Sequence, residues 1–152
     1  MTSNLLVTPK DKMGYEFWRL YTYQFVHAGW EHLFGNCLMQ LLIGIPLEMV
    51  HGPLRVGLIY SIGVIVGGCT DLIVTPTIGL VGASGGVYAL LTAFIANIVI
   101  NFDVMTILGK IARLIPISVF LIADIAGAVQ RSISTTHDNV SWAAHLGGIV
   151  QT

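Results

Sequence analysis

Long runs of apolar residues, separated by short polar or glycine- and proline-containing breaks, make up most of this chain. A membrane-spanning helix needs about 20 mostly apolar residues. The runs therefore predict five membrane segments, at residues 31–50, 54–75, 78–101, 111–130 and 141–152. A short turn, His51-Gly52-Pro53, is predicted between the first two segments. The last run is too short to cross a bilayer, so we expect the chain to be a fragment.

Composition supports the membrane interpretation. Hydrophobic residues make up 55% of the 152 residues and charged residues only 10%, whereas soluble domains carry about 25% charged residues. We therefore expect an all-α polytopic membrane protein in the lipid bilayer, with a single domain over residues 1–152, a loop over 1–30 and membrane helices over 31–152. The net charge of −1 gives no reason to expect nucleic acid as a partner. Cys37 and Cys69 lie in apolar segments and indicate neither a disulfide nor a metal framework.

Several polar residues interrupt the apolar segments, and each needs a reason, because a charged group within a membrane helix costs about 2.5–3.5 kcal/mol on insertion scales. The residues concerned are His27, His32, Asn36, Asp71, Ser84, Asp124 and His145. His32 and Asn36 are four residues apart, as are Ser84 and Tyr88, so each pair shares one face of a helix. We expect Asp71 to reach the membrane interface and Asp124 to bond a neighbouring helix.

Three of these groups fit the parts of a serine hydrolase. A serine hydroxyl becomes a good nucleophile when a neighbouring base takes its proton, and acyl transfer needs donors that face the developing oxyanion. Ser84 is the candidate nucleophile and His145 the candidate base, while His32 and Asn36 offer the donors. Gly85 and Gly86 would let the helix that carries His145 approach Ser84.

Each pattern alone has a commoner structural interpretation. Gly82 and Gly86 form a GxxxG pair, which usually packs helices together, and Ser84 would then be one more small residue. His32 and Asn36 would lie at a helix end, bonded to water or headgroups. His145, next to a polar loop, would be an interfacial histidine.

Taken in chain order, these residues resemble the rhomboid family of intramembrane serine proteases, and most closely its animal secretase-type members. Trp18-Arg19 match the family's WR motif, and His27, His32 and Asn36 match its HxxxxHxxxN pattern. The segment GASGGVYALL resembles the catalytic GxSG segment, with Gly82, Ser84, Gly85 and Tyr88 in place, and AAHLGG resembles the segment that carries the catalytic histidine, here His145. The resemblance extends from about residue 14 to 150.

The resemblance implies a six- or seven-helix fold and a Ser84–His145 dyad without an aspartate. His32, Asn36 and the Ser84 backbone N–H would hold the oxyanion, Tyr88 would stack on the catalytic histidine, and Trp18-Arg19 would be structural. It also implies cleavage of single-span membrane proteins, a multi-pass location in the plasma membrane, Golgi or another secretory-pathway membrane, and no metal or cofactor.

The chain departs from the family pattern at both ends. No apolar run precedes Trp18, and the sixth helix of the family is cut soon after His145. A catalytically inactive rhomboid-like protein, or a truncated isoform that binds membrane clients, is therefore the alternative. A transporter or channel would also explain intramembrane polar residues, but not these residues in this order.

Overall fold

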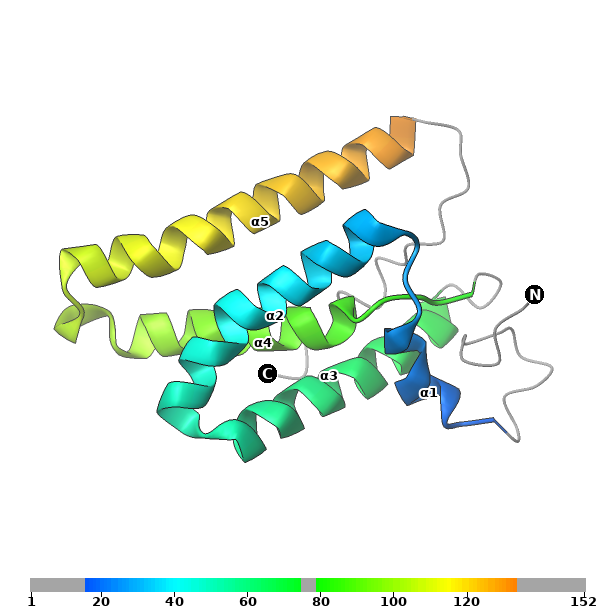
Figure 1. The fold of residues 1–152 in the computed structure, drawn as a ribbon, viewed down its shortest axis with the longest axis horizontal. Helices are drawn as coiled ribbons and strands as arrows, with labels where there is room; N and C mark the ends of the chain where they lie inside the picture. The colour runs from blue at the N-terminus through cyan, green and yellow to red at the C-terminus, as the bar shows by residue number, and fades with distance from the viewer. Residues whose placement is uncertain (1–15, 75–78, 134–152) are drawn as a thin grey trace. The chain divides into compact units, whose positions relative to one another are not determined.

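The computed structural model describes residues 16–74 and 79–133, and every element assigned within these ranges is helical (Figure 1). The elements are α1 (Arg19–Thr22), η1 (Tyr23–Phe25), α2 (Trp30–His51), α3 (Pro53–Val74), α4 (Ser84–Ile100), η2 (Phe102–Val104) and α5 (Ile107–Ile133). The contacts divide the described residues into two compact units, the first up to Thr92 and the second from Ala93. The all-α prediction is confirmed for the described residues.

Helices α2 and α3 form a helical hairpin, as the apolar runs at 31–50 and 54–75 predict (Figure 1). Gly52 joins them with a φ of +82°, a conformation that favours glycine, and its N–H donates to the Glu48 carbonyl at 2.9 Å. Pro53 then occupies the first turn of α3, where a missing N–H costs nothing. The predicted His51-Gly52-Pro53 turn is confirmed.

Two described helices, α2 and α3, are long and apolar enough to cross a membrane, and the 17-residue α4 is a shorter apolar helix. Helix α5 covers the predicted segment at 111–130 and begins four residues before it. The fifth predicted segment lies outside the described residues.

The predicted start of the third segment, at residue 78, is wrong. Helix α4 begins at Ser84, because Gly82 has a φ of +101°, which a right-handed helix cannot contain. The chain before it is extended at Leu80, which is buried with Tyr23 of η1 and Val64 of α3. This cluster anchors the segment that leads to Ser84.

The predicted loop at 1–30 contains the short helices α1 and η1, and α1 packs on α3. Tyr23 is fully buried, and its hydroxyl donates to the Val64 carbonyl at 2.7 Å. The ring also lies close to Gly68, where an added Cβ would be 3.2 Å from Tyr23 Cε1. Burial raises the pKa of the Tyr23 phenol above its ordinary value. The loop is therefore attached to α3 by a buried side chain.

Asp71 is buried by the protein itself, and its expected position at the membrane interface stays a prediction. Its side chain lies in α3 and the residue is only 1% exposed. This part of α3 is covered by α1, which packs on it.

The second unit contains the end of α4, η2 and α5. Lys110 lies over the Phe102 ring, with its Nζ 3.9 Å from the ring centroid, a cation–π contact. The Arg113 guanidinium donates to the Met105 sulfur at 3.2 Å. These two contacts attach the first turns of α5 to the segment that precedes it.

Candidate active site

Ser84 is the first residue of α4, and its side chain is partly exposed, while Gly82, Ala83, Gly85 and Gly86 around it are buried. Helix bonding begins just before it, since the Val87 N–H donates to the Ala83 carbonyl at 3.1 Å. The first N–H groups of a helix have no acceptor within the helix and carry a partial positive charge. The Ser84 hydroxyl and backbone N–H therefore lie at a helix end suited to stabilise a negative oxygen.

The His32 ring, from the first turn of α2, lies directly against Gly82. A Cβ added at Gly82 would be 2.6 Å from His32 Cε1 and 2.8 Å from Nε2, closer than side-chain atoms pack. Because Gly82 also has a φ of +101°, glycine is required there twice, for the backbone turn and for the close approach of the imidazole. The fold thus brings His32 to the segment two residues before Ser84.

The hydrogen bonding of His32 indicates which ring nitrogen carries its proton. The Ala28 N–H donates to His32 Nδ1 at 3.3 Å, so the neutral imidazole carries its hydrogen on Nε2. Nε2 is the nitrogen that the glycine contact places near Gly82. His32 is consequently arranged as a hydrogen-bond donor toward the start of α4.

Asn36 lies one turn further along α2 on the same face, as its spacing from His32 predicts. It is buried, 7% exposed, and its Nδ2 donates to the His32 carbonyl at 2.9 Å. This bond uses one of the two amide hydrogens, so the group has a second hydrogen for an oxyanion. The convergence of His32 and Asn36 on one oxyanion stays a prediction.

His27 packs its ring edge against His32, with the centroids 5.2 Å apart and the planes at 70°. Its Nε2 is buried without a hydrogen-bond partner. Burial lowers the pKa of the His27 imidazole, which favours the neutral ring. His27 is therefore placed to support the orientation of His32.

The Trp18-Arg19 motif lies at the start of α1. Arg19 is 5% exposed and its guanidinium pairs with Glu16 at 2.7 Å, while Trp18 is half exposed and packs its ring edge on Phe17. Because α1 packs on α3, these contacts fit the structural role that we expect for the motif.

Tyr88 lies one helical turn after Ser84 in α4, so the predicted shared helix face is confirmed. The Tyr88 residue is 6% exposed. His145 lies outside the described residues. The Ser84–His145 contact and the stacking of Tyr88 on that histidine therefore stay predictions. The same holds for the role of Gly85 in admitting the helix that carries His145.

A polar network that the sequence pattern did not predict lies beside the candidate site. Tyr60 of α3 lies against Gly86, where an added Cβ would be 2.4 Å from Tyr60 Cε2. The Tyr60 hydroxyl donates to Gln24 Oε1 at 2.8 Å and accepts from Gln40 Nε2 at 3.2 Å. The space at Gly86 is therefore filled by α3. Uncharged polar residues within apolar runs could have indicated this network in the sequence, since such groups need hydrogen-bond partners in a membrane.

Comparison with known proteins gives one family. The Rhomboid domain model matches residues 14–151. The chain is 45% identical to rhomboid-related protein 2 of Mus musculus over 88% of this chain and 45% of that protein. It is 42% identical to rhomboid-related protein 1 of Caenorhabditis elegans over 91% of this chain and 39% of that protein.

A further relative, inactive rhomboid-related protein 2 of Caenorhabditis elegans, is 39% identical over 89% of this chain and 38% of that protein. The chain thus spans less than half the length of these curated relatives. No solved structure matches the chain.

Proposed function

The chain belongs to the rhomboid family of helical membrane proteins, and from this premise we propose that it is an intramembrane serine endopeptidase with a Ser84–His145 dyad. The observation that carries the proposal is the His32 ring against Gly82, which brings a hydrogen-bond donor of α2 to the segment that ends in Ser84. A simple helix-packing motif does not need an imidazole whose Nε2 faces that segment. The partial exposure of Ser84 at the start of α4 also supports a reactive role.

In the proposed reaction, Ser84 Oγ forms a bond to the scissile carbonyl carbon while His145 takes the hydroxyl proton. His32 Nε2–H, the Asn36 amide and the Ser84 N–H stabilise the negative carbonyl oxygen of the tetrahedral intermediate. The C–N bond then breaks and His145 gives its proton to the leaving amine. Water, activated by the same histidine, hydrolyses the acyl-enzyme and restores Ser84. No metal or cofactor enters these steps.

The expected substrates are single-span membrane proteins cut near their outer end. This part of the proposal rests on the family resemblance and on α2 and α3, which are long enough to cross a bilayer. The expected location is a multi-pass position in the plasma membrane, Golgi or another secretory-pathway membrane.

The test uses membranes that contain the chain, a fluorophosphonate probe and a single-span substrate. Ser84→Ala should abolish labelling and cleavage, and His145→Ala should lower the rate by about 10⁴-fold or more. Ser118→Ala, which removes an exposed hydroxyl of α5, is the matched control and should leave both signals unchanged. Labelling and cleavage that persist in Ser84→Ala would remove Ser84 from the mechanism. If the chain is inactive, a version extended at both ends to the length of the relatives is assayed in the same way. Activity of the extended version alone would show that the length of this chain, and not the proposed reaction, accounts for the loss.

The second candidate is a catalytically inactive rhomboid-like protein that binds membrane clients. The relative named as inactive, 39% identical, favours it. Both Ser84 and His145 are present in this chain, which favours the protease. The same Ser84→Ala variant separates the two functions, because client binding without catalysis predicts that client levels and distribution do not change.

A further inference from the structure

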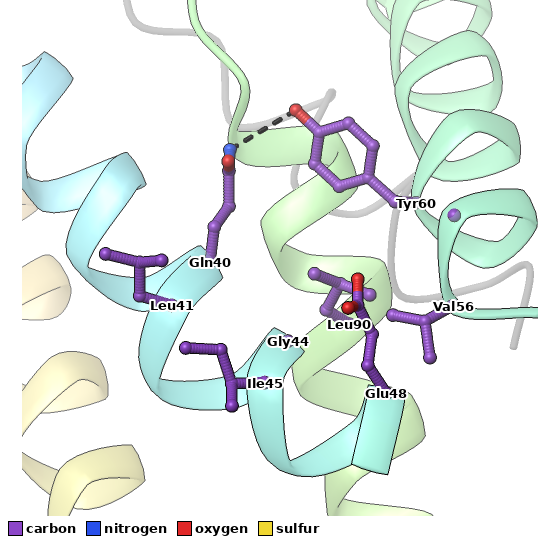
Figure 2. A pocket seen from close by; sticks show the side chains of 9 residues that line it. Gln40, Leu41, Gly44, Ile45, Glu48, Val56, Tyr60 and Leu90 are labelled. Carbon is purple, nitrogen blue, oxygen red and sulfur yellow. Dashed lines mark hydrogen bonds between the residues drawn. The ribbon is translucent and has the colours of Figure 1, made fainter. Parts of the chain in front are cut away.

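A pocket of about 310 Å³ lies between α2, α3 and the first half of α4 (Figure 2). Its apolar walls are formed by Leu41 and Ile45 of α2, Val56 of α3 and Leu90 of α4. Gly44 and Gly57 leave the space open, since a Cβ at Gly44 would only touch Leu90 at 3.9 Å and one at Gly57 would meet nothing within 4 Å.

The pocket opens to the outside of the protein along α2. Leu41 and Ile45 line it and are 58% and 52% exposed. Because α2 and α3 are long and apolar enough to cross a membrane, the apolar residues exposed on them are suited to contact with lipid. An acyl chain is therefore an occupant that the open side of the pocket suits.

One end of the pocket is closed by a polar contact between two of its own lining residues. Figure 2 shows the bond between Gln40 and Tyr60, which measures 3.2 Å. The Tyr60 hydroxyl donates its one hydrogen to Gln24 and accepts a bond from Gln40. It therefore has no hydrogen left to donate to a ligand at this end.

The opposite end carries a carboxylate. Glu48 is exposed, lines the pocket, and makes no ion pair with another described residue. The exposed Arg55 lies in the first turn of α3, just across the Gly52 connection, so an acidic and a basic group occupy the same end of the hairpin. This pair of charges complements a headgroup that carries both an ammonium and a phosphate.

We propose that this pocket binds one acyl chain of an aminophospholipid of the phosphatidylethanolamine class, with the ammonium group at Glu48. The volume, at the lower limit of ligand pockets (about 300–1,000 Å³), suits part of a single chain. It excludes a transmembrane helix, whose diameter with side chains is about 10–12 Å. Ser84, His32 and Asn36 do not line this pocket.

The test uses the chain in lipid nanodiscs that contain photoactivatable phosphatidylethanolamine, phosphatidylcholine or phosphatidylglycerol with the same acyl chains. Mass spectrometry locates the labelled peptides. We expect the ethanolamine lipid to label the pocket walls of α2 and α3 more strongly than the other two. The primary ammonium of ethanolamine is positively charged and donates hydrogen bonds to a carboxylate. The quaternary ammonium of choline has the charge but no N–H donor, and the glycerol headgroup has no positive charge.

Two variants, each with a control, distinguish binding of the lipid headgroup from binding of the acyl chain. Glu48→Gln should lower ethanolamine-lipid labelling by about two- to fivefold, the range for an ion pair at an exposed site, whereas Glu31→Gln, at the other end of α2, should not. Gly57→Leu should fill the pocket and remove its labelling, whereas Gly35→Leu, which also meets nothing within 4 Å, should not.

Circular dichroism and a monodisperse detergent extract confirm that each variant is folded. If Gly57→Leu is not, Gly44→Ala, which gains only an ordinary contact with Leu90, takes its place with a partial loss expected. Equal labelling by the three lipids, or pocket labelling that Gly57→Leu leaves intact, overturns the proposal. A single-span substrate peptide could also displace all three lipids and cross-link in the pocket itself. That result overturns the lipid proposal and identifies a substrate site.

Discussion

Replacing Gly82 by alanine tests the contact on which the candidate active site depends. The new Cβ would lie 2.6 Å from His32 Cε1 and 2.8 Å from Nε2, whereas carbon atoms pack at about 3.5–4.0 Å. The imidazole would have to move by about 1 Å, and overpacking of this kind costs about 1–3 kcal/mol. The φ of +101° adds backbone strain, which for such conformations is about 1–3 kcal/mol.

Gly29→Ala is the control that separates these two costs. Gly29 has the same φ of +101°, but a Cβ there would meet nothing within 4 Å. Both variants should therefore share the backbone strain, and only Gly82→Ala should displace His32. The difference between their free energies of unfolding, measured in detergent by chemical denaturation, should be about 1–3 kcal/mol.

Activity should separate the two variants further. If His32 donates to the oxyanion, its displacement removes one donor and lowers the rate by about 10²–10³-fold. The assay is the fluorophosphonate labelling rate of Ser84, compared at equal folded fractions. Equal stability and equal labelling in Gly82→Ala and Gly29→Ala would refute the contact and, with it, the placement of His32 beside the nucleophile.

Three other predictions concern the structure around the site. Tyr60→Phe should destabilise the fold by about 1–3 kcal/mol in the same denaturation assay, because it leaves the Oε1 oxygen of the buried Gln24 without its donor. Tyr21→Phe, which loses only a 3.5 Å contact at an exposed site, should have little effect, and equal losses would contradict the network. Burial raises the pKa of Tyr23, so the stabilisation from its neutral phenol is complete below the unfolded value of about 10 and is lost as the pH rises above it. Tyr23→Phe should make this alkaline loss of stability less steep, and an unchanged slope would assign the loss to other groups. Burial lowers the pKa of His27, so stability should fall as the pH drops below the unfolded value of about 6.5; unfolding measured at pH 7 and pH 5 should show a smaller difference in His27→Gln than in the unaltered chain, and an equal difference would rule His27 out as its source.

Hydrophobic patterning was enough to predict the helical hairpin of α2 and α3 and the turn between them. An apolar run bounded by Gly and Pro has few other structures available when it lies in lipid, because every backbone polar group must be bonded within the segment. Spacing also placed His32 with Asn36, and Ser84 with Tyr88, on shared helix faces, since that relation depends only on the helical repeat.

The helix start at Ser84 could not be predicted from apolarity. Residues 79–83 are as apolar as a helix, but Gly82 adopts a positive φ, and Leu80 is held in a cluster with Tyr23 and Val64. The partners in that cluster come from elements more than 15 residues away in the chain. Sequence pattern alone carries no information about such contacts.

The motif residues, their order and the helical class of the protein were determined by the sequence itself, because residue type and local spacing carry them. Only the tertiary structure showed that His32 lies on Gly82, that Tyr60 fills the space at Gly86, and that Asp71 is enclosed. Each of these facts depends on which surfaces of α1, α2 and α3 pack together. That choice is made by side-chain shape and buried hydrogen bonds between distant segments, which no local pattern records.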